Sequence, residues 1–218
     1  MNVNTGPTLA AVQAELTGEF AGVFSSQTVE QILEDSYSQL LPANIAGFLP
    51  LLAERFARER LRAAARVLPG RPQDGALRPL VLFVCTANSG RSQMAAALLA
   101  LRSTGAVEVA SAGTQPGDRV QDEVATVLAE VGVSTSELFP KPLTDEVVSG
   151  ADVVVTMGCG DSCPVLPGRR YIDWNVADPA GADLEEVRRV RDDIDAHIAA
   201  LLDELLSARD SATASAPI

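Results

Sequence analysis

Hydrophobic residues recur at two different spacings along the chain. In the first part, apolar residues fall three or four positions apart, which is the period of an amphipathic helix. This spacing predicts helices over residues 7–20, 29–41 and 45–67. Three amphipathic helices with short turns form a small bundle, and the Pro- and Gly-rich stretch 69–75 is typical of a linker. We therefore expect a helical bundle and linker over residues 1–78.

Two prolines and one apolar stripe refine this picture. Pro42 is expected to end the second helix. Pro50 either falls early enough in the third helix to be tolerated or marks a break. The third helix carries a broad apolar stripe, formed by Phe48, Leu51, Leu52, Phe56 and Leu61.

From residue 79 onward, short apolar runs alternate with helical patterns. The runs are rich in β-branched residues and predict buried strands over residues 81–85, 107–111, 152–156 and 171–174. Helices are predicted over residues 93–102, 120–131, 143–148 and 183–206. This alternation indicates an α/β fold with a four-stranded, parallel, doubly wound sheet. We expect this second domain to span residues 79–210, followed by a disordered tail, 211–218, that is rich in Ser and Ala.

The most informative stretch joins the first predicted strand to the helix after it. A loop at a helix N-terminus directs several backbone N–H groups at one point and adds the positive end of the helix dipole. Gly90 lets the backbone turn tightly, and the Arg91 guanidinium can grip two oxygens of a tetrahedral anion. The stretch therefore predicts an oxyanion site. It consists of Thr86, Ala87, Asn88, Ser89, Gly90 and Arg91.

A cysteine at the start of this loop makes it a candidate active site. Thiolates near an arginine at a helix N-terminus are stabilised, so we expect a lowered pKa for Cys85 and a nucleophilic role. Ser92 could donate a hydrogen bond to that thiolate, and Asn88 is expected to hold the loop in shape. Taken singly, Cys85 could be a small core residue and Arg91 a surface charge, but the combined Cys-x5-Arg-Ser pattern favours the functional interpretation. It is not the nucleotide P-loop, which needs a lysine that is absent here.

Further reactive residues follow the third and fourth predicted strands. Ligands bind outside the carboxyl ends of parallel strands, so these residues are expected at the same edge as Cys85. Cys159 and Cys163 are close enough in sequence to form a disulfide, and half of a zinc site or an incidental pair are the alternatives. Asp178, held in a turn by Pro179, would be a proton donor if it faces the oxyanion site and a plain turn residue otherwise.

Composition narrows the function classes. The net charge of −12 and the pI near 4.5 argue against nucleic-acid binding. No apolar run is long enough to span a membrane, and the N-terminus lacks the features of a secretory signal. An odd count of three cysteines indicates a reducing, cytoplasmic compartment with working thiols. The single histidine, His197, argues against a His-based triad or a multi-His metal site, so neither a metal nor a cofactor is expected. Trp174 and His197 are interpreted as structural.

Four separated segments share the order and residue types of one family. They are Cys85–Met94, Ser111–Gly113, Thr156–Pro164 and Asp178–Pro179. Together they resemble the thioredoxin-coupled arsenate reductases built on the low-molecular-weight tyrosine phosphatase fold. The resemblance covers about residues 79–206, and residues 1–78 look like the N-terminal helical extension of some members.

The resemblance implies a role for each reactive residue. Cys85 would attack arsenate held by Arg91 and the loop backbone, and Asp178 would protonate the departing hydroxyl. Cys159 would then attack the Cys85 sulfur, and arsenite would leave with two electrons. Cys163 would attack Cys159, which moves the disulfide to a loop where thioredoxin could reduce it.

Departures from the family pattern bear on the choice of function. Ala96 stands where some members carry a glutamate that helps to bind potassium. Gly90 replaces a second loop cysteine of the phosphatases, and Ala180 replaces an aromatic residue that would stack on phosphotyrosine, so both favour a reductase. The alternatives are a phosphatase, a reductase that uses mycothiol in place of Cys159, and an oxyanion or redox sensor that binds partners through the bundle. The bundle is also a candidate surface for homodimerisation.

Overall fold

The computed structural model describes residues 7–41, 48–69, 78–159, 163 and 165–214, with side chains up to residue 208. The chain divides into two compact units. Unit 1 comprises residues 1–68 and 144–150, and unit 2 comprises residues 69–143 and 151–218. A short segment from the middle of the sequence therefore belongs with the N-terminal residues.

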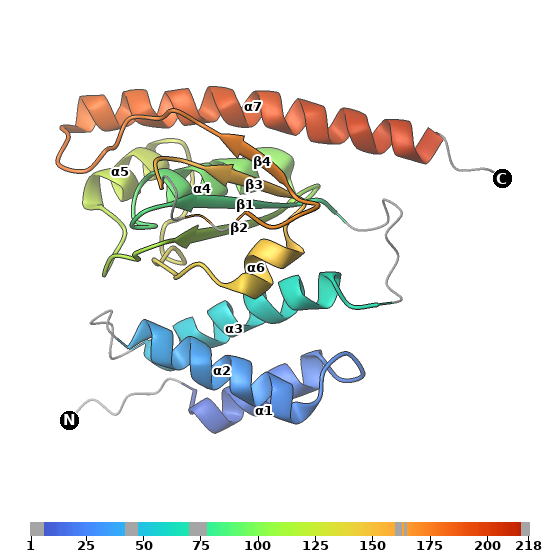
Figure 1. The fold of residues 1–218 in the computed structure, drawn as a ribbon. Coiled ribbons are helices and arrows are strands. Elements are labelled where there is room, and N and C mark those ends of the chain that lie inside the picture. The colour runs from blue at the N-terminus through green and yellow to red at the C-terminus, as the bar shows by residue number, and fades with distance from the viewer. Residues whose placement is uncertain (1–6, 42–47, 70–77, 160–162, 164, 215–218) are drawn as a thin grey trace, which may run out of the picture. The chain divides into compact units, whose positions relative to one another are not determined.

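Unit 1 is built from helices. Its members are α1 (Leu9–Glu19), α2 (Ser26–Leu40), α3 (Leu49–Arg66) and α6 (Asp145–Gly150) (Figure 1). Side-chain oxygens of Thr8 and Ser25 accept hydrogen bonds from the first turns of α1 and α2. These caps satisfy N–H groups that a helix start leaves open. The three helices predicted for the N-terminal part are confirmed.

Apolar residues at helical spacing form the core of unit 1. Leu33 of α2 and Phe56 and Leu61 of α3 are each at most 1% exposed. Pro50 lies in the first turn of α3, where a proline does not break the helix. Phe48 is 66% exposed, so its predicted place on the buried stripe is wrong. It precedes the first residue of α3, and the helical period does not extend to it.

Helix α6 packs closely on α3. A Cβ on Gly150 would lie 2.6 Å from the Ala63 carbonyl oxygen, so the helices approach within backbone contact. Arg66 Nε donates to the Gly150 carbonyl oxygen at 2.9 Å. The buried Arg60 side chain of α3 donates to Glu146 Oε1 of α6 at 2.9 Å and to Asp35 Oδ2 of α2 at 2.7 Å. The segment predicted as a helix of the α/β domain is therefore held by α3.

Unit 2 is built on a parallel sheet. Its strands are β1 (Leu80–Cys85), β2 (Glu108–Gly113), β3 (Val153–Thr156) and β4 (Arg170–Asp173), in the order β2-β1-β3-β4. The predicted four-stranded parallel sheet is confirmed. The register pairs Cys85 with Gly113, Val84 with Thr156 and Thr156 with Asp173, so the carboxyl ends of all four strands meet at one edge.

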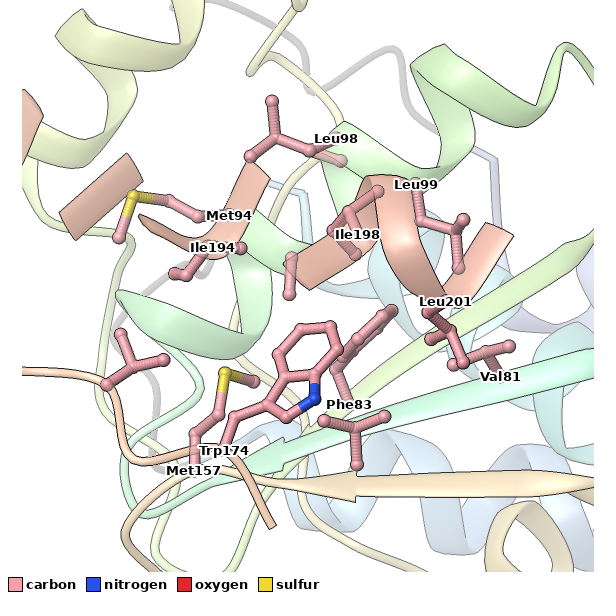
Figure 2. Packing of buried hydrophobic residues seen from close by; sticks show 14 of the residues in the cluster. Val81, Phe83, Met94, Leu98, Leu99, Met157, Trp174, Ile194, Ile198 and Leu201 are labelled. Carbon is pink, nitrogen blue, oxygen red and sulfur yellow. The ribbon is translucent and has the colours of Figure 1, made fainter. Parts of the chain in front are cut away.

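Three helices cover one face of this sheet: α4 (Arg91–Ser103), α5 (Asp122–Glu130) and α7 (Leu184–Ala214) (Figure 1). Figure 2 shows the core between them, where Phe83 of β1 meets Trp174 and side chains of α4 and α7. The Trp174 ring lies 5.6 Å from that of Phe83 and stacks on His197 at 4.9 Å. Trp174 and His197 thus serve packing, as expected.

The C-terminal helix is longer than predicted. α7 continues past the expected end near Leu206, so residues 211–214 of the predicted disordered tail are helical. Alanine and arginine in this stretch favour helix. Pro42, residues 215–218 and all but the first residue of the predicted linker lie outside the described residues. Within the described chain, no helix is long and apolar enough to cross a membrane.

Candidate active site

The loop between β1 and α4 encloses the Cys85 thiol. Cys85 ends β1 and is 2% exposed. Its Sγ accepts a hydrogen bond from the Asn88 N–H at 3.3 Å and lies 3.0 Å from Ser92 Oγ. Asn88 Nδ2 donates to Ser92 Oγ at 2.8 Å, and the Ser92 hydroxyl can donate to the sulfur when Cys85 is a thiolate. Two donors therefore face the predicted nucleophile, as a thiolate requires.

The carbonyl groups of this loop are held by one segment, residues 114–121. Four backbone N–H groups of that segment donate to loop carbonyl oxygens at 2.8–3.2 Å. The bonds join Thr114 to Cys85, Gln115 to Thr86, Gly117 to Ala87 and Gln121 to Ser89. The N–H groups of Ser89, Gly90 and Arg91 donate to no acceptor among the described residues. Open N–H groups at a helix start suit an oxyanion.

Asn88 fixes the shape of the loop. It is fully buried and has a φ of +48°, which asparagine adopts more readily than most residues. Its Oδ1 accepts hydrogen bonds from the Lys141 N–H at 2.8 Å and from Gln93 Nε2 at 3.0 Å. These bonds attach the loop to Lys141 and to α4, whereas we expected the Asn88 side chain to bond the backbone of the loop itself.

Arg91 and Asp178 pair with each other. Arg91 is the first residue of α4 and is 9% exposed. Its Nη2 donates to Asp178 Oδ2 at 2.7 Å, while Asp178 Oδ1 accepts from the Ala180 N–H at 3.1 Å. The Asp178 carboxylate thus rests on the guanidinium that an oxyanion would use. An anion that binds to Arg91 through two nitrogens would therefore replace Asp178 at Nη2.

Two glycines permit this close arrangement. A Cβ on Gly90 would lie 2.9 Å from Pro179 Cγ, so a side chain there would push on the turn that carries Asp178. A Cβ on Gly158 would lie 2.5 Å from Arg91 Nη1. The Gly158 carbonyl oxygen also accepts a hydrogen bond from Thr86 Oγ1 at 3.2 Å. The loop between β1 and α4 is therefore tied to the loop that follows β3.

The loop after β3 carries the other two cysteines. Cys159 is buried, Cys163 is half-buried, and all three cysteines are free thiols. A hydrogen bond with Cys163 is the main cause that lowers the pKa of Cys159 to about 7, against the effect of burial. The same bond, burial and the charge of Cys85 raise the pKa of Cys163. Cys159 is thus the more nucleophilic of the pair near neutral pH.

The predicted site residues gather at the carboxyl edge of the sheet, though they do not all touch. Direct bonds link Cys85 to Ser92 and Asn88, and Arg91 to Asp178. Among the described residues, no hydrogen bond joins Cys85 to Asp178 or to either of the other cysteines. Sequence reasoning missed residues 114–121, because their role depends on backbone bonds that no side-chain pattern reveals.

The neighbourhood of Ala96 offers no carboxylate from α4. Ala96 lines a cavity of about 190 Å³ together with Gln93, Lys141 and Glu137, and Glu137 comes from the segment after α5. Within the part of the chain that the structure describes, no cluster of three His, Cys, Asp or Glu side chains could hold a metal ion.

Known proteins share this architecture. The profile of the low-molecular-weight phosphotyrosine protein phosphatases matches residues 80–211, and that of the N-terminal domain of protein-tyrosine-phosphatase-like proteins matches residues 9–65. The solved thioredoxin-dependent arsenate reductase of Corynebacterium glutamicum is 39% identical and superposes with a TM-score of 0.80, covering 92% of this chain and 97% of its own.

Shorter relatives match the second part of the chain. Arsenate reductase 1 of Staphylococcus epidermidis is 37% identical over 54% of this chain and 91% of its own length. The low-molecular-weight protein tyrosine phosphatase of T. tengcongensis is 28% identical over 58% of this chain and 99% of its own, with a TM-score of 0.54. Because the family profile spans more than half of its length, the chain belongs to the low-molecular-weight phosphotyrosine protein phosphatase family, as its motifs indicated.

Proposed function

We propose that this protein reduces arsenate to arsenite with three thiols and is regenerated by thioredoxin. The observation that carries the proposal is the placement of Cys85 in an oxyanion loop, with the Cys159–Cys163 pair following the strand next to β1. A phosphatase needs one nucleophilic cysteine, whereas a reductase needs further thiols to collect the oxidation. Relatives that are arsenate reductases, one of them thioredoxin-dependent, support the same conclusion.

In the first half-reaction, arsenate binds to the open N–H groups of the loop and to Arg91. The Cys85 thiolate attacks arsenic, and a sulfur–arsenic bond forms as an arsenic–oxygen bond breaks. Asp178, displaced from Arg91 by the anion and protonated, gives its proton to the departing oxygen, which leaves as water. Bonds from Ser92 and the Asn88 N–H hold the sulfur in line for the attack.

In the second half-reaction, the Cys159 thiolate attacks the Cys85 sulfur. A disulfide forms, the sulfur–arsenic bond breaks, and its electron pair reduces arsenic from the +5 to the +3 state. Cys163 then loses its proton to solvent and attacks the Cys159 sulfur, which releases Cys85 as a thiolate. Thioredoxin would reduce the resulting Cys159–Cys163 disulfide by exchange.

Two assays on the whole chain test this proposal. We expect arsenate-dependent NADPH oxidation with thioredoxin and its reductase, lost in Cys85→Ser and Cys159→Ser, and little hydrolysis of para-nitrophenyl phosphate. Mass spectrometry after one equivalent of arsenate should show a Cys159–Cys163 disulfide. Strong ester hydrolysis that survives Cys159→Ser would favour the phosphatase. A mixed disulfide of Cys85 with mycothiol would mean that mycothiol, and not thioredoxin, is the reductant.

The setting and assembly of the protein are part of the proposal. Three free thiols suit a reducing cytoplasm. Leu41 and Phe48, which are 56% and 66% exposed, make unit 1 a candidate surface for homodimerisation. Sedimentation of wild type and of a Phe48→Ser variant would test the dimer, and a monomer in both would exclude it.

A further inference from the structure

A carboxylate outside the proposed relay lies at the same sheet edge. Asp173 is the last residue of β4 and pairs in register with Thr156, the last residue of β3. Thr156 Oγ1 donates to Asp173 Oδ1 at 2.5 Å. The backbone continues from Thr156 through two residues to Cys159. The hydroxyl thus anchors the Asp173 carboxylate at the base of the loop that carries the thiol pair.

Among the described residues, no arginine, lysine or histidine forms a salt bridge with Asp173. Asp178, another carboxylate at this edge, is paired with Arg91. Cys85 and Asp173 are the described groups outside the pair whose charge acts most strongly on Cys163, and the Arg91 guanidinium lies beside Gly158. Arg91 is paired with Asp178 and forms no salt bridge with Asp173, so the Asp173 charge can act on the thiols.

We propose that Asp173 is a positioning residue for the redox pair: anchored by Thr156, its charge stabilises the Cys159–Cys163 disulfide relative to the reduced pair. The inference rests on the proposed function, because it assigns the thiol pair the role of terminal disulfide. In support, the charge of Asp173 raises the pKa of both cysteines, although the hydrogen bond between the thiols dominates in each.

The direction of the effect follows from the charges of the two redox states. Reduction of the disulfide by a dithiol takes up two electrons and, above pH 7, one proton, and it yields one thiol and one thiolate. The disulfide is neutral, so Asp173 opposes only the reduced state. A stabilised thiolate makes a disulfide more oxidising, and a carboxylate nearby does the opposite. Asp173 would therefore make the disulfide easier to form and harder to reduce.

The first test measures the thiolate at Cys159 without arsenate. In a Cys85→Ser, Cys163→Ser background, the rate of Cys159 alkylation by iodoacetamide is followed against pH. Asp173→Asn, which keeps an acceptor for Thr156, is expected to move the midpoint to lower pH. Asp173→Glu should restore it, and Asp203→Asn, which removes the same charge from exposed α7, should leave it unchanged. Thr156→Val should give part of the shift.

The second test measures the disulfide itself. In a Cys85→Ser background, equilibrium with glutathione should favour the reduced pair at least threefold more in Asp173→Asn, which equals about 14 mV. An unchanged or raised alkylation midpoint with an unchanged equilibrium, in a variant that keeps its helical circular dichroism, would overturn the inference. Neither measurement uses arsenate, so failure here leaves the proposed function untouched, and failure of arsenate turnover leaves this result standing.

Discussion

At the scale of single residues, glycines allow the loop after β1 and the Arg91 guanidinium to lie close to neighbouring backbone. A Cβ on Gly113 would lie 2.7 Å from the Thr86 carbonyl oxygen, and one on Gly158 would meet the Arg91 guanidinium. Gly158 also has a φ of +70°, which L side chains rarely adopt. A side chain at either position would move the loop backbone or the Arg91 guanidinium. These two glycines therefore allow the loop backbone and the Arg91 guanidinium to keep their positions.

Gly90→Cys tests the contact between the loop and the Asp178 turn. The new side chain would press on Pro179, so we expect kcat/KM for arsenate to fall about tenfold, or about 1.4 kcal/mol in transition-state free energy, while Cys159 alkylation is unchanged. Gly18→Ala is the control, since a Cβ there meets nothing within 4 Å and alanine favours the helix. Full activity of Gly90→Cys would show that Pro179 can move freely.

Ser92→Ala tests the hydrogen bond to the nucleophile. Hydrogen bonds to charged groups contribute about 1.5–3 kcal/mol, so arsenate turnover should fall roughly tenfold or more. Ser103→Ala on the same helix is the matched control, because the buried Ser103 hydroxyl has no partner in the described chain. Its loss should leave activity intact and raise stability by up to about 1 kcal/mol. Equal effects of the two changes on turnover would contradict the role of Ser92.

The sequence could predict the parts of the site that are continuous along the chain. The Cys-x5-Arg-Ser loop is a single stretch, so its strand, turn and helix could be inferred together. The anchoring of Asp173 by Thr156 and the bonds from residues 114–121 could not be inferred, because they join residues whose proximity depends on strand order and register. The pairing of Asp178 with Arg91 was likewise hidden, although both were named as site residues.

At the scale of secondary-structure elements, α6 is the clearest case of a helix placed by distant partners. It has only six residues, too few to be stable in isolation. Its stability depends on α3, through the Gly150–Ala63 contact and the Arg60 and Arg66 hydrogen bonds. The sequence pattern could predict that α6 is a helix, but it could not predict that α6 packs in unit 1.

Arg60→Ala tests this attachment. The Arg60 side chain is 6% exposed, and its removal leaves two carboxylates without their cation. We expect a loss of about 2–3 kcal/mol of unfolding free energy in urea, somewhat below the cost for fully buried pairs. Arg62→Ala, on the same helix but 63% exposed, should cost less than about 1 kcal/mol. Similar losses in both variants would mean that the Arg60 bonds add little.

The same ion pair predicts a dependence on pH. Burial alone would raise the pKa of Glu146, but the Arg60 guanidinium outweighs it and lowers that pKa below its usual value. The stabilisation is therefore present above the unfolded-state pKa of about 4.3 and is lost as pH falls through the folded-state value. Urea unfolding at pH 7 and at pH 3.5 should show a smaller acid loss in Glu146→Gln than in wild type. Exposed Glu123→Gln should match wild type.

At the scale of the whole molecule, the compact units do not follow the order of the chain. The family profiles match residues 9–65 and 80–211, but residues 144–150 fall within the second match and the first unit. The sequence predicted two successive parts, because linkers and patterns are read along the chain. It could not show that the polypeptide leaves the sheet domain, contributes α6 to the helical unit and returns to form β3.

Unit 1 contains two separate stretches of the chain, residues 1–68 and 144–150. Cleavage of the backbone at one place between them should therefore not separate the two fragments. With a specific protease site placed within residues 70–77, we expect the cleaved halves to co-elute in size-exclusion chromatography, because α3 still grips α6. Adding Arg60→Ala should let the N-terminal piece escape, whereas separate elution of the unaltered halves would contradict this account. The N-terminal helices would then be a module that binds α6 without a covalent link, and this module could be supplied in trans or exchanged between relatives.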